Sequence, residues 1–304
     1  MRNKREKNYS RFRTAVQIAA AAFFNGWAKG YFKGTIYTGN SKVACVPVLN
    51  CYSCPGAWGS CPIGSMQAVV DGGRHKMSFY VTGIIMLFGL IFGRFICGFL
   101  CPFGLIQDLL YKIKTRKVKI KEKIDRPLRY LKYIVLLLFV ILLPTFAVND
   151  FGMSLPYFCK YICPAGTLGA GLPLVAMNRS LQNIVGSMFQ WKVIIMLIIL
   201  AISIIISRPF CKYICPLGAI YSLFNRFSMI TLELDENKCI SCGKCAKKCP
   251  MDIDPVKDIN SAECIKCGVC KSVCPAKCID FKRPGKKIEL SKSINTCKSN
   301  FADK

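Results

Sequence analysis

The sequence contains one histidine, His75, and this shortage excludes several kinds of metal site. A single imidazole cannot provide both axial ligands of a two-histidine haem, nor the paired histidines of common zinc and copper sites. No Cys-x-x-Cys-His run is present, which excludes covalent haem attachment. No Cys-x3-Cys-x2-Cys run is present either, which argues against a radical S-adenosylmethionine enzyme. We therefore expect His75 to be a surface anchor rather than a ligand.

Acidic residues are also scarce, with 16 Asp and Glu against 43 Lys and Arg, a formal net charge of +27. So basic a chain suggests binding either to nucleic acid or to a membrane surface. Hydrophobic residues make up 53% of the chain and the mean hydropathy is +0.35. The Lys and Arg residues gather beside the apolar runs, as on the cytoplasmic side of membrane proteins. The sequence therefore predicts a membrane partner and no nucleic acid.

Four apolar stretches approach the roughly 20 residues that cross a bilayer. They are residues 14–32, 77–97, 130–148 and 190–207. The first is rich in Ala and contains Lys29, so a signal peptide is an alternative interpretation of that stretch. Basic residues crowd the segment before the first stretch and the loop 112–132, whereas loops 33–76 and 149–189 carry few. The positive-inside rule then places both termini in the cytoplasm of a bacterial or archaeal cell, with the chain in the inner membrane.

The strongest motif lies near the C-terminus, where the spacing C-x2-C-x2-C-x3-C-P occurs twice. This spacing is typical of paired [4Fe–4S] clusters, in which the fourth Cys of each run binds the other cluster. Zinc sites use pairs of Cys rather than triplets. The predicted ligands of the first cluster are Cys239, Cys242, Cys245 and Cys274. The predicted ligands of the second are Cys264, Cys267, Cys270 and Cys249.

An internal repeat predicts a third cluster. FCKYICP occurs at 158–164 and again at 210–216, and Cys-Pro-x-Gly occurs four times. Two C-x3-C-P pairs fall at the predicted cytoplasmic side, and together they offer four thiolates. These are Cys97, Cys101, Cys211 and Cys215. Arg94 and Arg208 each precede such a pair by three residues, where they can offset cluster charge or serve as positive-inside anchors.

The remaining cysteines of the membrane part fall on the predicted outer side, and we expect a fourth cluster there. By symmetry with the third cluster, Cys61, Cys159 and Cys163 are ligands. Position 57 is Ala, so the fourth ligand is Cys54, with Cys51 as the alternative. Together with Cys45 this side holds more cysteines than one cluster needs, so disulfides remain an alternative. We expect Cys278 and Cys297 to be free thiols.

These features define a fold and two domains. The expected fold is an α-helical membrane protein of about four pseudo-repeated transmembrane helices, joined to a small α+β ferredoxin-like domain. Residues 1–224 form the membrane domain, and residues 225–304 form the cytoplasmic domain with two [4Fe–4S] clusters and a basic tail. Residues 236–281 resemble bacterial two-cluster ferredoxins. With its four apolar stretches and the pairs Cys97/Cys101 and Cys211/Cys215, the chain resembles ferredoxin-type membrane proteins of the NapH and NosR kind.

The resemblance implies an electron-transfer subunit that exchanges electrons with redox partner proteins on one or both faces, or with quinone, rather than a stand-alone enzyme. The additional outer cysteines favour electron passage through the whole membrane. One alternative is a quinol-oxidising donor subunit of a larger reductase. A redox regulator or assembly factor is another. The direction of electron flow does not follow from cysteine spacing.

Overall fold

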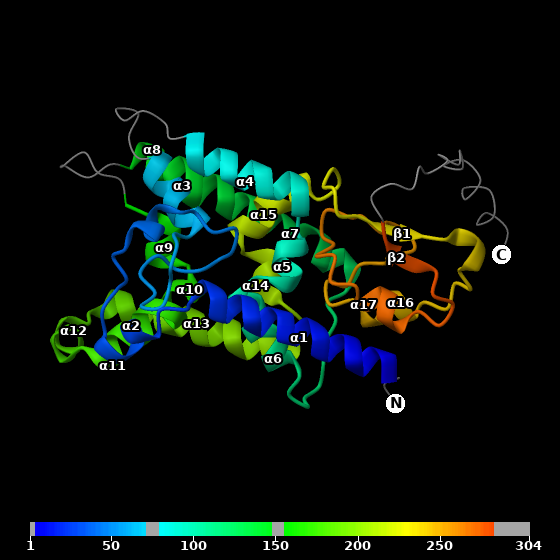
Figure 1. Cartoon of the computed structure of the whole chain (residues 1–304), viewed down its shortest axis with the longest axis horizontal. Coiled ribbons are helices and arrows are strands. Elements are labelled where there is room, and N and C mark those ends of the chain that lie inside the picture. Colours follow the sequence, from blue (N-terminus) through cyan, green and yellow to red (C-terminus); the bar gives the residue numbers. More distant parts are fainter. Residues whose placement is uncertain (1–3, 71–78, 148–154, 283–304) are drawn as a thin grey trace.

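A computed structural model describes residues 4–70, 79–147 and 155–282. The predictions for His75, Cys297 and the basic tail fall outside these residues. The molecule is elongated (Figure 1), with a small unit that holds β1, β2, α16 and α17 at one end and the helices α2, α11 and α12 at the other. The longer helices α4 (Phe79–Phe92), α7 (Glu122–Val135) and α13 (Ser187–Ile205) run between the two ends. The unit predicted to hold the C-terminal cysteine motifs thus lies at one end of the long axis.

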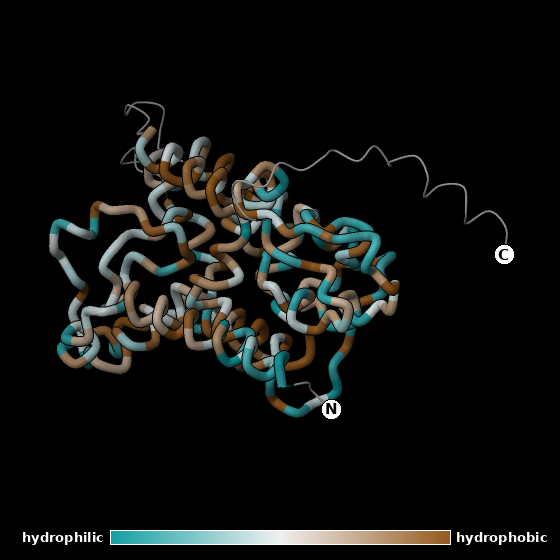
Figure 2. The backbone as a smooth tube through the Cα atoms, turned by 45° about the vertical axis from the view of Figure 1, so that its right-hand side comes forward, coloured by the Kyte–Doolittle hydropathy of each residue, from teal (hydrophilic) through white to brown (hydrophobic). Residues whose placement is uncertain are grey.

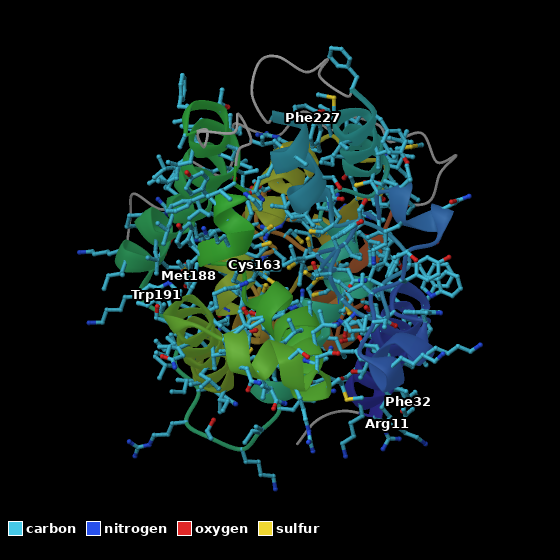
Figure 3. All side chains as sticks on the ribbon, turned by 90° about the vertical axis from the view of Figure 1, so that its left-hand side faces the viewer. Arg11, Phe32, Cys163, Met188, Trp191 and Phe227 are labelled. Carbon is cyan, nitrogen blue, oxygen red and sulfur yellow. The ribbon has the colours of Figure 1, made fainter. Side chains whose placement is uncertain are left out.

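Two helical stretches among the described residues are long and apolar enough to cross a membrane, Glu122–Phe146 and Ser187–Ile205. Only 22% and 17% of their apolar windows are buried inside the molecule. A core helix of a soluble protein would instead be covered, so these surfaces suit lipid. Figure 2 shows the hydrophobic colour along the long helices and the hydrophilic colour over the C-terminal unit and the start of α1. Figure 3 shows Met188 and Trp191 of α13 pointing outward.

The other two predicted spans differ from their expected lengths. The stretch 14–32 is split into α1 (Lys4–Phe24) and α2 (Ala28–Lys33). Between the two helices the backbone N–H of Trp27 donates to the carbonyl of Gly56 instead of continuing the helix. The stretch 77–97 contains α4 (Phe79–Phe92), which is shorter than a membrane span over the residues that the structure describes. The number of four transmembrane helices therefore stays a prediction.

Two helical stretches contain wide, π-helical turns, and a proline explains each. Glu122–Phe146 consists of α7 (Glu122–Val135), the π segment η2 (Leu136–Leu142) and α8 (Leu143–Phe146). Pro144 lacks an N–H and crowds the carbonyl four residues before it, which lies in η2. The second π segment, η3 (Thr167–Gly171), lies between α10 (Pro164–Gly166) and α11 (Leu172–Met177). Pro173 likewise crowds the carbonyl four residues before it, which lies in η3.

Short helices position the cysteines of the membrane part. Four of the Cys-Pro steps here, those of the Cys-Pro-x-Gly motifs, begin a helix, because Pro fits the first helical position where its missing N–H costs nothing. The helices that follow such a step are α3 (Pro62–Val70), α6 (Pro102–Tyr111), α10 and α15 (Pro216–Phe224). The remaining short helices are η1 (Asn40–Val43), α5 (Phe95–Phe99), α9 (Tyr157–Tyr161), α12 (Arg179–Ile184) and α14 (Pro209–Tyr213).

The C-terminal unit is built on a two-stranded antiparallel sheet. β1 (Leu232–Leu234) pairs with β2 (Ile279–Phe281), with Leu232 opposite Phe281. Between the strands lie η4 (Glu236–Lys238), α16 (Lys244–Lys248) and α17 (Val269–Val273). The expected mainly helical fold with a small α+β unit is confirmed.

Candidate metal centres

Three hollows of nearly equal size lie along the molecule, and each is lined by four or more cysteines. The middle hollow, with an empty volume of about 370 Å³, lies between α5 and α14 of the two repeats. Its cysteines are Cys97, Cys101, Cys211 and Cys215. All four are buried. The structure thus brings together the two C-x3-C-P pairs that the sequence assigns to one site.

The other two hollows lie in the C-terminal unit, and each has an empty volume of about 350 Å³. The near C-terminal hollow is lined by Cys249, Cys264, Cys267 and Cys270. The far C-terminal hollow is lined by Cys239, Cys242, Cys245, Cys274 and Cys278. The last Cys of each run therefore lines the hollow of the other run, as the spacing predicts. Cys278, predicted to be a free thiol, forms no disulfide, and its Sγ lies 3.3 Å from that of Cys274.

The donors in these hollows fit iron–sulfur clusters. Sulfur is the ligand that such clusters use, and backbone N–H groups support it: that of Gly218 lies 3.4 Å from the Sγ of Cys215, and that of Lys266 lies 3.4 Å from the Sγ of Cys264. Within the three described ranges, no three His, Cys, Asp or Glu side chains converge to hold a single metal ion. Thiols spread around a wider space suit a cluster better than one zinc ion.

Two buried arginines cross between the repeats beside the middle hollow. Arg94 donates from Nη2 to the carbonyl of Cys211 at 3.3 Å, and Arg208 donates from Nη1 to the carbonyl of Cys97 at 2.6 Å. Both side chains are 0% exposed. A positive-inside anchor would face lipid headgroups or water, so burial favours the other interpretation, that these cations offset charge at the centre.

Partly buried carboxylates, Asp108 and Glu263, balance these arginines. Asp108 receives two hydrogen bonds from Arg208, at 2.8 and 2.6 Å, and also pairs with Arg13 of α1. Glu263 pairs with Arg94 at 2.7 Å and with Lys132 at 2.5 Å. Burial acts to raise the pKa of Glu263, but the charge of Arg94 and then that of Lys132 outweigh it and lower that pKa to about 2. Glu263 is therefore charged at neutral pH.

The Glu263 contacts join the C-terminal unit to the membrane part. Glu263 precedes Cys264 of the near C-terminal hollow, and its partner Arg94 lies on the wall of the middle hollow. A Cβ placed on Gly98 of α5 would lie 2.5 Å from the carbonyl oxygen of Ile265, so the two backbones touch. Lys212 adds an ion pair with Asp252. The near C-terminal hollow and the middle hollow are thus held side by side.

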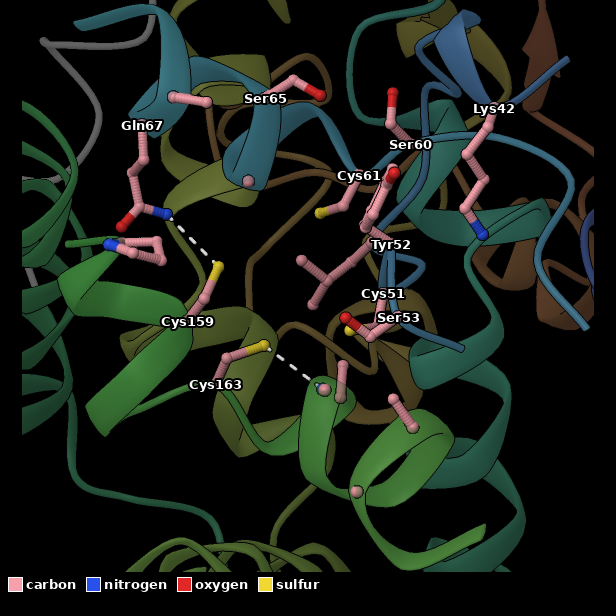
Figure 4. Close-up of a pocket in the computed structure, with 18 of the residues that line it drawn as sticks. Lys42, Cys51, Tyr52, Ser53, Ser60, Cys61, Ser65, Gln67, Cys159 and Cys163 are labelled. Carbon is pink, nitrogen blue, oxygen red and sulfur yellow. Dashed lines mark hydrogen bonds between the residues drawn. The ribbon is translucent and has the colours of Figure 1, made fainter. Parts of the chain in front are cut away.

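A fourth, larger cavity lies toward the opposite end of the molecule (Figure 4). Its empty volume is about 1900 Å³. The cysteines that line it are Cys51, Cys61, Cys159 and Cys163, while Lys42 and Lys192 bring positive charge. Exposed Val43 and Tyr52 form part of its wall, so it reaches the surface. In Figure 4 the sulfurs of Cys61, Cys159 and Cys163 point into the space between them.

Cys54, the sequence-based choice for this site, lies elsewhere. Its Sγ contacts the hydroxyl of Tyr31 at 3.0 Å and Oδ1 of Asn25 at 3.3 Å, and it is absent from the cavity wall. Cys45 is buried and lines none of the four spaces. All 19 cysteines that the structure describes are free thiols, so none of them forms the disulfide that the sequence left open.

One residue, Leu49, lines both the middle hollow and the large cavity. It is 3% exposed. Tyr221 of α15 holds this segment by donating from its hydroxyl to the carbonyl of Pro47 at 2.9 Å. The two spaces are therefore separated by a thin apolar wall.

Comparison with known proteins agrees with these centres. A 4Fe-4S binding domain family matches residues 75–121, 132–176 and 189–231, and a 4Fe-4S dicluster domain family matches residues 231–275. Uncharacterized protein MJ0749 of Methanocaldococcus jannaschii is 31% identical over 204 residues, covering 65% of this chain and 68% of that protein. The chain belongs to the family of ferredoxin-type proteins with 4Fe-4S binding domains.

Two further relatives have descriptive names. Putative electron transport protein YccM of Escherichia coli is 28% identical over 186 residues, or 59% of this chain and 47% of YccM. Ferredoxin-type protein NapH of the same organism is 26% identical over 194 residues, or 62% of this chain and 59% of NapH. Regulatory protein NosR of Stutzerimonas stutzeri also matches, which confirms the resemblance to NapH and NosR. The chain thus spans about half to two thirds of MJ0749, YccM and NapH but only 22% of NosR, and no solved structure matches it significantly.

Proposed function

We propose that this protein passes electrons through a membrane along four [4Fe–4S] clusters, one in each hollow and one in the large cavity. The observation that carries the proposal is the set of three cysteine-lined hollows of equal size in a row, followed by a fourth cysteine-lined space behind a shared wall. When bound, the clusters supply one-electron redox chemistry, and the chain's own residues hold them, exclude water and balance their charge.

The ligands that we propose follow the lining of each space. The far C-terminal hollow uses Cys239, Cys242, Cys245 and Cys274, and the near one uses Cys249, Cys264, Cys267 and Cys270. The middle hollow uses Cys97, Cys101, Cys211 and Cys215. The large cavity uses Cys51, Cys61, Cys159 and Cys163, with Cys51 in place of Cys54.

The contacts between neighbouring spaces give an order of transfer. Leu232 and Leu234 of β1 line the near and far C-terminal hollows respectively, so one strand bridges them. Glu263–Arg94 and Gly98–Ile265 join the near C-terminal hollow to the middle hollow. Leu49 joins the middle hollow to the large cavity. Each pair of neighbouring spaces is therefore joined by a strand, a direct contact or a shared wall residue.

We propose the membrane arrangement with this function. Residues 1–224 form the membrane domain and residues 225–304 the cytoplasmic domain, in the inner membrane of a bacterium or archaeon. The exposed apolar surfaces of Glu122–Phe146 and Ser187–Ile205 support this arrangement. Redox proteins at the two faces would be the partners, and the chain would act as an electron-transfer subunit without substrate chemistry of its own.

Iron and acid-labile sulfide, measured per chain on anaerobically purified protein, test the proposal. Four clusters predict about sixteen irons in the full chain. Removal of residues 236–304 should leave about eight irons per chain. Cys101→Ala and Cys215→Ala should each remove about four irons, because both residues are proposed to bind the same cluster. About twelve irons in the full chain and about four in the truncated chain, with those four lost in the Cys101 and Cys215 variants, would mean that the large cavity holds no cluster and would rule out electron passage to that face.

The size of the large cavity favours one second candidate, oxidation of a quinol. The cavity is larger than each hollow and opens to the surface, so a small molecule could enter it. An apolar aromatic ring could lie against Leu174 and Phe189, which line the cavity. Reduction of the clusters by a short-chain quinol, blocked by a quinone-site inhibitor, would support this candidate; unchanged cluster spectra with excess quinol would reject it.

A further inference from the structure

Two glutamines occupy equivalent positions in the internal repeat. Gln67 follows Cys61 by six positions in CPIGSMQ, and Gln107 follows Cys101 by six positions in CPFGLIQ. They lie on α3 and α6, the helices that begin at these Cys-Pro steps. Both side chains are almost completely buried, at 1% and 0% exposure. A buried amide needs hydrogen-bond partners, so the partners of these two residues are informative.

Each glutamine donates to a cysteine of the other half of its site. Nε2 of Gln67 lies 3.3 Å from the Sγ of Cys159, a contact drawn in Figure 4. Nε2 of Gln107 lies 3.2 Å from the Sγ of Cys211. Cys159 and Cys211 are themselves equivalent, since each is the first Cys of a copy of FCKYICP. Equivalent glutamine side chains in the two sites thus donate to equivalent cysteine sulfurs.

The surroundings fix the orientation of each amide. Oε1 of Gln67 accepts a hydrogen bond from the backbone N–H of Phe158 at 3.0 Å, and an N–H can only donate, so Nε2 must face the sulfur. Nε2 of Gln107 also lies 3.5 Å from the carbonyl of Phe103, which can only accept. Oε1 of Gln107 has no hydrogen-bond partner in the part of the chain that the structure describes. The donor therefore faces the sulfur in both cases.

A second contact repeats with the first. The backbone N–H of Gly166 lies 3.4 Å from the Sγ of Cys163, and that of Gly218 lies 3.4 Å from the Sγ of Cys215. The middle hollow and the large cavity therefore share two sulfur contacts, one from a glutamine side chain and one from a glycine backbone. Donors to a ligating sulfur stabilise the more negative, reduced state of a cluster.

We propose that Gln67 and Gln107 are positioning residues that raise the reduction potentials of the clusters in the large cavity and the middle hollow, each through one N–H···S hydrogen bond. The inference rests on the proposed function, because it assumes a cluster at each place. Reduction adds one electron to the cluster, and no covalent bond is formed or broken. The glutamine keeps its proton and only stabilises the added charge.

The test is a redox titration of the full-length protein with dithionite, followed by electron paramagnetic resonance, on Gln67→Leu and Gln107→Leu. Each substitution should lower the reduction potential of the cluster that it contacts and of no other cluster. At a fixed solution potential, the ratio of reduced to oxidised cluster should then fall about tenfold. Gln182→Leu is the control, because Gln182 is exposed and donates only to the backbone carbonyls of Val175 and Ala176. It should leave every potential unchanged.

Gln67→Met and Gln107→Met separate this role from a purely structural one, because Met nearly preserves the side-chain volume without a donor. Potentials equal to those of the parent protein would overturn the proposal. Loss of iron from both the Leu and the Met variant of a centre would also overturn it there, since the contact would then be needed to hold the cluster. A parent protein without iron in the large cavity would contradict the proposed function, while the Gln107 variants would still test the middle hollow.

Discussion

Cys51 and Cys54 are three residues apart, and only the folded chain shows which of them faces the large cavity. The Cys54 thiol is held by Tyr31 and Asn25, whereas Cys51 lies on the cavity wall with Cys61, Cys159 and Cys163. Burial and nearby partners, rather than spacing, separate the two. We therefore expect that replacing Cys51 removes a cluster ligand and that replacing Cys54 does not.

We predict that Cys51→Ala removes about four irons per chain and that Cys54→Ala removes none. Loss of one thiolate opens a cluster to solvent, whereas Cys54 does not line the cavity and instead hydrogen-bonds with Tyr31 and Asn25 and packs with Ala57 and Ala170. Iron analysis and electron paramagnetic resonance of the two variants measure the difference. Equal iron contents in both variants would contradict the assignment of Cys51.

Gly98 allows a close approach between the membrane part and the C-terminal unit. Since a Cβ there would lie 2.5 Å from the Ile265 carbonyl, Gly98→Ala should destabilise the protein by about 1–3 kcal/mol. Gly83→Ala is the matched control, because nothing lies within 4 Å of its Cβ position and Ala favours a helix. Thermal unfolding of both variants in detergent would show the contrast. A lower melting temperature for Gly83→Ala than for Gly98→Ala would be the contrary result.

At the scale of elements, buried charges fix α1, α6 and α14 against one another. Asp108 of α6 meets Arg13 of α1 and Arg208, which precedes α14. Arg208 has φ of 49°, a left-handed backbone that is unfavourable for a side-chain-bearing residue. Its bonds to Asp108 and to the Cys97 carbonyl oppose that cost. The three helices therefore depend on one carboxylate.

Asp108→Asn should lower the free energy of unfolding by about 3–5 kcal/mol, because it leaves two arginines without their counter-charge. Glu122→Gln should change it by less than about 0.5 kcal/mol, since Glu122 is 76% exposed and pairs only with Arg126. Denaturant titrations of both variants provide the comparison. Similar losses in the two would show that the buried network adds no stability.

Sequence pattern predicted the elements unevenly, and the reasons are physical. The Pro residues after Cys101 and Cys215 indicated the starts of α6 and α15, because proline fits the first position of a helix. The break at residues 25–27 was missed, since it depends on Trp27 pairing with Gly56 in a distant loop. The buried role of Gln67 and Gln107 was missed as well, although their equal spacing from Cys61 and Cys101 is visible in the sequence.

For the whole molecule, the grouping of the four inner cysteines followed from the repeat, and that of the C-terminal cysteines from their spacing. The way in which the C-terminal unit meets the membrane part did not follow, because the ion pairs that join them involve single residues without any local pattern. Glu263 with Arg94, and Asp252 with Lys212, are examples. Which carboxylate meets which cation depends on the packed structure.

We predict that Glu263→Gln loosens this joint, because Arg94 and Lys132 are then left buried with less compensation. Amides of residues 261–267 should exchange faster with deuterium, in line with a local loss of about 3–5 kcal/mol. Asp235→Asn is the control, since its pair with Lys238 lies at the surface. Hydrogen exchange followed by mass spectrometry compares the two. Unchanged protection in Glu263→Gln would show that other contacts suffice.

The wall at Leu49 has an electrical consequence for the proposed carrier. Leu49, which is 3% exposed, lines both the middle hollow and the large cavity, and an apolar side chain there lets electrons tunnel but has no group that could pass a proton. The protein would conduct electrons and insulate against ions. Moving one electron between the two faces changes its electrical energy by about 2.3 kcal/mol for each 100 mV of membrane voltage. Electron transfer through the protein would therefore charge or discharge the membrane.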